Sequence, residues 1–280
     1  MSKIVVTADS TCDLSPELRE RYHVELVPLY VNFGEDSRRD GVDAQPDDIY
    51  DYYRSSGKLT TTSAASPGDY HTFFKGFTDK GYEVIHLNIS SGFSATHQNA
   101  MMAASDLKGV YPVDSYNLST GTGLLVLEAC DMAEEGMPAL DIVTRLEEMR
   151  CRVRASFILD TLEYLWKGGR CSGVTALGAN LLKLKPCIEV RDGKMGVGKK
   201  FRGNLSNVME QYTNTRLEGV RPELKRVFIT HSGIDPAIID RVKARVRQLH
   251  PFEEILVTRA GCVVSNHCGP NTLGVLFIEK

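Results

Sequence analysis

The chain has 280 residues, of which 42% are hydrophobic and 25% charged, and its formal net charge is -3. These values are typical of a globular protein, and the acidic excess argues against nucleic acid as a main partner, because phosphate binding requires clustered basic residues. Seven cysteines without a Cys-x-x-Cys pair favour a reducing cytoplasm over a disulfide framework or a zinc site. We find no apolar run of membrane-spanning length and expect no stable membrane insertion.

The first half of the chain repeats a pattern of strand, hydroxyl-rich turn and helix. The elements predicted up to residue 77 are a strand at 3–8, a helix opening at Ser15-Pro16, an extended run at 24–33, a polar segment at 34–48, a short helix at 49–53, a capping loop at 60–69 and a helix at 70–77. Such alternation predicts a parallel sheet with helices on both faces. Ligands then bind at the carboxyl ends of the strands.

The segment that follows the next predicted strand, at 83–88, carries the clearest binding signal. An apolar stripe from Ala100 to Leu107 predicts a helix after it. Ser91, Ser94 and Thr96 therefore lie where a strand turns into a helix, and unpaired backbone N–H groups there favour an anion. N-capping accounts for one hydroxyl but not for three.

The pattern changes near residue 150, after a strand at 111–114 and helices at 124–135 and 138–150. We therefore predict two domains, 1–150 and 151–280, the second of α+β type. Its predicted elements are a strand at 155–160, helices at 174–185, 206–217 and 238–249, a hairpin at 187–197 around Asp192-Gly193, strands at 227–230, 254–258 and 273–278, and a polar turn at 262–270 that ends a strand.

Other chemistries find little support. There is no phosphate-binding loop and no Gly-x-Gly-x-x-Gly after a strand, and the seven histidines form no i, i+4 pair, so we expect neither cofactor nor metal. A serine hydrolase could combine Ser94 or Ser91 with His267 and with Asp9 or Asp114. The Gly-x-Ser-x-Gly bracket of a nucleophile elbow is missing, which disfavours this alternative.

Six short motifs, in order and in spacing, resemble the DegV family over essentially the whole chain. They are Ala8–Leu14, Thr62–Pro67, Ser90–Thr96, Lys167–Ser172, Leu184–Pro186 and His267–Pro270. Departures from the family's usual pattern occur at Ala64-Ala65, Ala95, Asn266 and Cys268.

The resemblance implies a two-domain DegV-like fold that binds a long-chain fatty acid and has no catalytic activity of its own. Its members include subunits that present the acid to a dihydroxyacetone-kinase-like fatty acid kinase, which makes acyl phosphate. By resemblance, Thr62, Ser94 and His267 hold the carboxylate, Ser91 and Arg170 extend this network, and the acyl chain enters a tunnel between the domains. The alternative is a serine esterase or thioesterase that acts on lipid acyl groups.

Physical arguments add three expectations. Burying a methylene gains roughly 0.8 kcal/mol, so the tail supplies affinity and the hydroxyls supply orientation. Retention of the acid should respond to pH across the histidine range. A basic cluster either docks the kinase or forms an ordinary solvated face of the hairpin. The candidate tunnel walls are Phe93, Phe157, Ile158, Leu162, Leu165, Leu181, Leu182 and Ile188, and the cluster is Arg191, Lys194, Lys199, Lys200 and Arg202.

Overall fold

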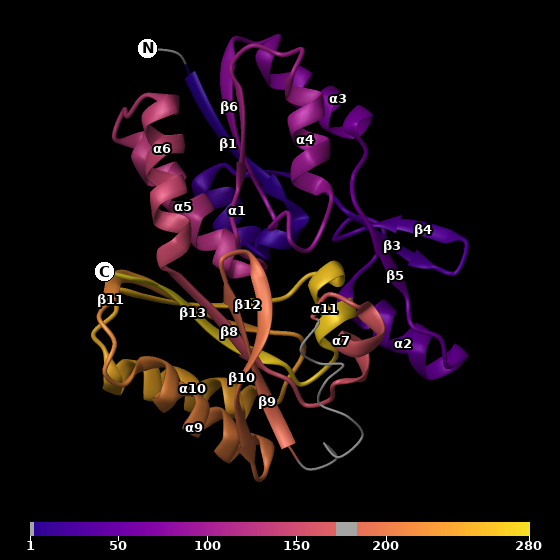
Figure 1. Cartoon of the computed structure of the whole chain (residues 1–280), viewed down its shortest axis with the longest axis vertical. Helices are drawn as coiled ribbons and strands as arrows, with labels where there is room; N and C mark the ends of the chain where they lie inside the picture. Colours follow the sequence, from indigo (N-terminus) through magenta and orange to yellow (C-terminus); the bar gives the residue numbers. More distant parts are fainter. Residues whose placement is uncertain (1–2, 172–183) are drawn as a thin grey trace.

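The computed structural model describes residues 3–171 and 184–280 and shows an α/β protein with two main sheets. A parallel sheet lies in the upper half of Figure 1 and a mixed sheet in the lower half, with a small third sheet to one side. The predicted class, a parallel-sheet first half and an α+β second half, is confirmed.

The parallel sheet has the strand order β2-β1-β6-β7. Helices α3 and α4 pack on one face and α5 and α6 on the other, as the alternation of strands and helices predicts (Figure 1). The elements of this half are β1 (Lys3–Asp9), η1 (Ser10–Cys12), α1 (Pro16–Tyr22), β2 (Glu25–Val27), α3 (Pro67–Thr78), β6 (Tyr82–Asn88), α4 (Thr96–Ala104), β7 (Val110–Asp114), α5 (Thr120–Glu134), α6 (Ala139–Met149) and η2 (Arg150–Arg152).

The mixed sheet has the strand order β10-β9-β8-β13-β11-β12, in which only β11 and β12 run parallel. Helices α9 and α10 pack together and share an apolar core with its strands. The elements of this half are β8 (Val153–Ile158), α7 (Glu163–Gly168), β9 (Leu184–Arg191), β10 (Lys194–Arg202), α9 (Leu205–Leu217), β11 (Pro222–His231), α10 (Pro236–Leu249), β12 (Glu254–Arg259), α11 (Cys262–Cys268) and β13 (Leu273–Glu279).

A three-stranded antiparallel sheet, β4-β3-β5, was not predicted from the sequence. Its strands are β3 (Tyr30–Phe33), β4 (Asp36–Arg39) and β5 (Thr61–Ser63), and α2 (Pro46–Ser56) follows β4. The segments expected to be a polar loop and a capping loop thus each contain a strand. They pair because β3 offers a partner on both sides, a tertiary effect that overrides their polar composition.

Helix α11 corrects a second expectation, since a turn at the end of a strand was predicted there. The amides of its N-cap residue and of its first residue are held by Asp side chains distant in sequence. The Gly261 N–H donates to Asp13 Oδ1 at 2.8 Å and the Cys262 N–H donates to Asp40 Oδ1 at 2.7 Å. These contacts satisfy N–H groups at the start of the helix, as a local capping side chain would. Because both Asp residues are distant in sequence, no local N-cap signal predicts the helix.

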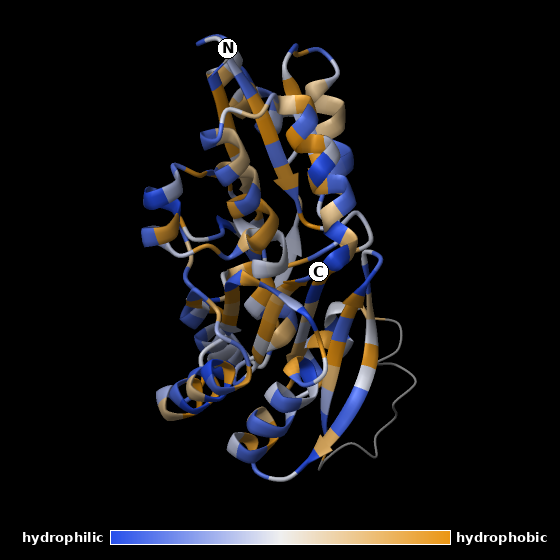
Figure 2. Cartoon of the chain, turned by 90° about the vertical axis from the view of Figure 1, so that its left-hand side faces the viewer, coloured by the Kyte–Doolittle hydropathy of each residue, from blue (hydrophilic) through white to orange (hydrophobic). Residues whose placement is uncertain are grey.

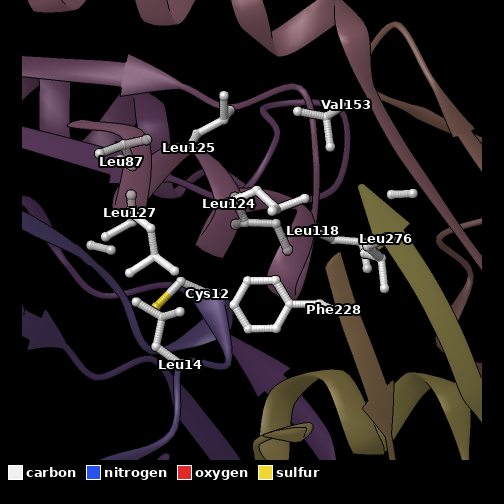
Figure 3. Packing of buried hydrophobic residues seen from close by; sticks show 14 of the residues in the cluster. Cys12, Leu14, Leu87, Leu118, Leu124, Leu125, Leu127, Val153, Phe228 and Leu276 are labelled. Atoms are coloured by element: carbon white, nitrogen blue, oxygen red, sulfur yellow. The ribbon is translucent and has the colours of Figure 1, made fainter. Parts of the chain in front are cut away.

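The core is continuous between the two main sheets. Helix α5 is buried along its first two turns and contacts both sheets, and its Leu124 belongs to the same apolar cluster as Phe228 of the mixed sheet (Figure 3). Apolar residues concentrate on the strands, whereas α9 and α10 turn polar residues outward (Figure 2). The predicted helix at 174–185 lies outside the described residues, apart from Leu184 and Lys185, which open β9.

The described residues contain neither a membrane-spanning helix nor a cluster of metal ligands. No helix among them combines the length and the apolarity that a membrane crossing requires. No group of three or more His, Cys, Asp or Glu side chains in the same residues is placed to hold a metal ion.

Candidate functional site

A cavity of about 450 Å³ is lined by all five residues that the family resemblance assigns to the ligand site: Thr62, Ser91, Ser94, Arg170 and His267. We call it the Thr62 cavity. Its remaining lining is Leu29, Ser63, Ala64, Ile89, Phe93, Ala95 and Val263. Hydroxyls, one imidazole and one guanidinium therefore face apolar side chains across one space, as an amphipathic ligand requires.

Strand β5 and helix α11 meet at this cavity through two side-chain pairs. Thr62 Oγ1 lies 3.0 Å from His267 Nε2, and the Thr60 hydroxyl bonds to the amide oxygen of Asn266. The Thr60–Asn266 pair was not predicted from the sequence. Together the pairs fix the side of α11 that carries the imidazole against the strand that carries Thr62.

The imidazole of His267 is neutral at physiological pH. Desolvation, with a smaller contribution from the Arg170 charge, lowers its pKa from 6.5 to about 4. Its Nδ1 atom is buried and has no hydrogen-bond partner among the described residues. A Cβ added to Gly168 would lie 2.3 Å from this Nδ1, so the C-terminal end of α7 packs directly on the ring.

Five backbone N–H groups of the 91–96 segment are bonded within the protein. The Ser91 N–H donates to Asp114 and the Gly92 N–H to Ser90 Oγ, while those of Phe93 and Ser94 donate to the Ser90 carbonyl and that of Thr96 to Ser94 Oγ. Of these five, only the Thr96 N–H belongs to helix α4, and the other four belong to the loop that precedes it, so the loop amides are not free to bind an anion. Helix α4 begins only at Thr96, whose side chain is fully buried and does not line the cavity.

The hydroxyl groups remain as donors. Ser94 Oγ accepts the Thr96 N–H at 3.3 Å, which leaves its own proton available. When His267 carries its proton on Nε2, Thr62 Oγ1 likewise accepts a hydrogen bond and directs its proton elsewhere. Both hydroxyls are thus arranged to donate to an anion.

The geometry disfavours the hydrolase alternative. Asp9 bonds to Tyr70, His86, Asn88 and the Ile89 amide, whereas Asp114 bonds to the Ser91 and Tyr116 amides. Neither carboxylate orients His267, whose ring contacts the Thr62 hydroxyl instead. A serine triad needs a carboxylate at the second imidazole nitrogen, and Nδ1 lacks one in the described part of the chain.

Arg170 is exposed at the edge of the cavity and donates to the Gly168 carbonyl at 2.7 Å. It is the single Lys or Arg in the described lining. The site therefore offers an anion one peripheral cation and several neutral donors.

The predicted tunnel walls are dispersed. Phe93 lines the Thr62 cavity, whereas Phe157 lines a second cavity of about 20 Å³ on the other side of α11. The remaining described candidates are buried or partly buried in the cores: Ile158, Leu162, Leu165 and Ile188. Leu181 and Leu182 lie outside the described residues.

The hydrogen bonds that hold the site segments in place were not predicted from the sequence. Four buried carboxylates each accept a backbone N–H from a segment that carries site residues: Asp9 from Ile89, Asp114 from Ser91, Asp13 from Gly261 and Asp40 from Cys262. The acidic residues stood out only as polar positions after strands. Their partners are defined by the tertiary fold.

Comparison with known proteins shows the family to which the chain belongs. The model of the family described as "Uncharacterised protein, DegV family" matches residues 3–280. The chain belongs to the DegV family. A DegV domain-containing protein of Clostridium perfringens is 31% identical over the full length of both chains.

Solved structures of DegV proteins extend the comparison to ligands. A fatty-acid-binding DegV family protein of Thermus thermophilus is 32% identical, with a TM-score of 0.90 over 100% of both chains. A stearic-acid-binding protein of Eubacterium ventriosum is 27% identical, with a TM-score of 0.84 over 100% of this chain and 99% of that one. The DegV fold of this chain is thus one on which fatty-acid binding is found.

Proposed function

We propose that this DegV chain binds a long-chain fatty acid, with the carboxylate held by Thr62, Ser94 and His267 in the Thr62 cavity. The observation that carries the proposal is the convergence of these three side chains on one cavity whose lining also includes apolar side chains such as Leu29, Ile89 and Phe93. Fatty-acid binding by proteins of the same fold supports the choice of ligand. Ser91 and Arg170 extend the network at its edge.

The donors suit a carboxylate that must stay reactive. Ser94 keeps a hydroxyl proton to donate, Thr62 does so when His267 is protonated on Nε2, and His267 is neutral, so the anion is not neutralised by a close bidentate cation. Its oxygen then keeps more of its nucleophilic character than it would beside a buried arginine. The tail supplies most of the affinity, at roughly 0.8 kcal/mol per buried methylene before the costs of association.

We further propose that the bound acid is presented to a partner, a dihydroxyacetone-kinase-like fatty acid kinase, in the cytoplasm. The resemblance to kinase-associated DegV proteins supports this step, and the cysteine pattern supports the compartment. In this proposal the chain is a carrier, with no cofactor, and the partner binds the phosphoryl donor. The basic cluster on β9 and β10 is the proposed docking surface.

Binding measurements test the carboxylate assignment. We expect Thr62→Ala, Ser94→Ala and His267→Ala each to weaken oleate binding about tenfold, the worth of a hydrogen bond to a charged group. Thr61→Ala is the matched control, because neighbouring strand residues point to opposite faces. Wild-type affinity in all three variants would remove the assignment, and a Ser94-linked acyl intermediate formed from acyl esters would favour the esterase alternative.

A further inference from the structure

The tip of the β9–β10 hairpin touches the loop that carries Ser91 and Ser94. The hairpin rises from the mixed sheet toward the parallel-sheet half (Figures 1 and 2). Its tip is Asp192-Gly193, with φ of 48° and 74°, the positive pair typical of a two-residue hairpin turn. The sequence predicts this turn but not what it contacts.

Ser90 makes the contact. Its hydroxyl donates to the Gly193 carbonyl at 2.9 Å and accepts the Gly92 N–H at 3.1 Å, and the residue is 1% exposed. Its own carbonyl accepts the N–H groups of Phe93 and Ser94 at 2.9 and 3.3 Å. One buried serine thus connects the hairpin tip to three consecutive amides that lead to Ser94.

The two backbones approach too closely for a side chain between them. A Cβ on Gly92 would lie 2.3 Å from the Gly193 carbonyl oxygen, and a Cβ on Gly193 would lie 2.7 Å from Ser90 Oγ. Gly193 also has positive φ, which penalises any other residue. The contact therefore depends on glycine on both sides and on a hydroxyl in the middle.

We propose that Ser90 and the hairpin tip are positioning residues for carboxylate binding: the Gly193 carbonyl fixes Ser90, and Ser90 fixes the loop that aims the Ser94 hydroxyl. Ser90 does not line the Thr62 cavity, so it acts through the loop rather than on the ligand. The inference rests on the proposed function. It adds that a hairpin of the mixed sheet positions the loop carrying Ser94, which follows a strand of the parallel sheet, for binding the carboxylate.

The test compares oleate with oleyl alcohol, which keeps the tail and lacks the anionic headgroup. We expect Ser90→Ala to weaken oleate binding about tenfold and to leave oleyl alcohol binding within about twofold, so that discrimination between acid and alcohol falls. Gly193→Ala should act in the same direction. Gly196→Ala is the control in the same hairpin, because a Cβ there meets nothing within 4 Å.

The outcomes separate this inference from the proposed function. Three outcomes would overturn the positioning role. Both ligands could lose affinity equally, both variants could distinguish oleate from oleyl alcohol as well as wild type does, or both variants could fail to fold. The contact would then stabilise the fold only, or have no role in binding. Wild-type protein that binds neither ligand, or that does not distinguish them, would instead contradict the proposed function.

Discussion

At the scale of single residues, the site depends on groups whose protonation differs from their ordinary behaviour. His267 is a neutral imidazole beside Thr62, because desolvation outweighs its basicity. The expected response of retention across the ordinary histidine range therefore needs correction. In the ligand-free protein the pKa of His267 is about 4, below the range in which an unperturbed histidine would change the charge of the site.

The first prediction concerns the stability of the ligand-free protein at low pH. The unfolded histidine binds a proton near pH 6.5, whereas the folded one binds it only near pH 4, so stability falls as pH decreases through this window. We expect His267→Gln to reduce this loss, measured by urea unfolding at a series of pH values. An identical pH dependence in wild type and variant would show that His267 titrates normally.

Asp13 should act with the opposite sign. Burial raises its pKa from 3.8 to about 8, so the folded state keeps a proton that the unfolded state loses, and stability falls as pH rises between these values. Asp13→Asn keeps an oxygen for the Gly261 amide and should flatten this part of the profile. The same unfolding series measures it, and a variant that retains the wild-type slope would contradict the assignment.

The sequence predicted the individual hydroxyl donors of the site but not the residues that bond to the site's side chains. Ser91 and Ser94 stood out because hydroxyls gather where a strand turns into a helix, whereas Thr62 was assigned by the family resemblance, and the structure brings all three to one cavity with His267. Asn266 stood out only as a departure from the family pattern. Its bond to Thr60 joins residues far apart in sequence, and no local pattern encodes such a pair.

At the scale of elements, the close packing of α7 on α11 controls the imidazole. Gly168 ends α7 against His267 Nδ1, where a methyl group would lie within 2.3 Å. Local sequence signals predicted the end of α7 but not the helix α11. The Lys167-Gly168-Gly169 break was evident, whereas α11 was mistaken for a turn because its Val263-Val264 pair favours a strand and its helix N-terminus is held by distant aspartates.

We predict that Gly168→Ala displaces the His267 ring and weakens oleate binding about tenfold or more. Gly76→Ala in α3 is the matched helical control, because its Cβ meets nothing within 4 Å and alanine favours a helix. Titration of both variants with oleate checks the prediction. Unchanged affinity in Gly168→Ala would mean that the ring tolerates displacement or takes no part in binding.

Strand β10 permits two interpretations of the basic cluster. It is an edge strand of the mixed sheet, and lysines on an edge discourage pairing with another sheet. Lys200 and Arg202 also make no salt bridge with the described residues, so their charges are available to a partner. Arg191 and Lys194 flank the hairpin tip, closer to the site.

Charge reversal separates these interpretations. If the cluster docks the kinase, Lys200→Glu combined with Arg202→Glu should abolish kinase-coupled acyl-phosphate formation and leave oleate binding unchanged, because opposite charge is then required at the interface. Both quantities are measured on one preparation. Intact turnover would leave the lysines with their edge role alone, and lost oleate binding would assign them to the ligand site.

At the scale of the whole molecule, the site is assembled by both halves of the chain. Thr62 and Ser94 come from segments before residue 100, whereas Arg170 and His267 come from segments after residue 168, and α5 joins the two sheets through one core. The sequence predicted the two halves from their periodicity. It could not predict their mutual placement, which depends on contacts such as that between Ser90 and Gly193.

The central claim is that a fatty acid occupies this shared site through Thr62 and Ser94, and extraction of the purified protein tests it most directly. Denaturing extraction followed by mass spectrometry should recover a long-chain fatty acid from wild type and from Thr61→Ala, and much less from the folded double variant Thr62→Ala/Ser94→Ala. Wild-type protein that carries and binds no fatty acid, or a double variant that retains as much as wild type, would contradict the account.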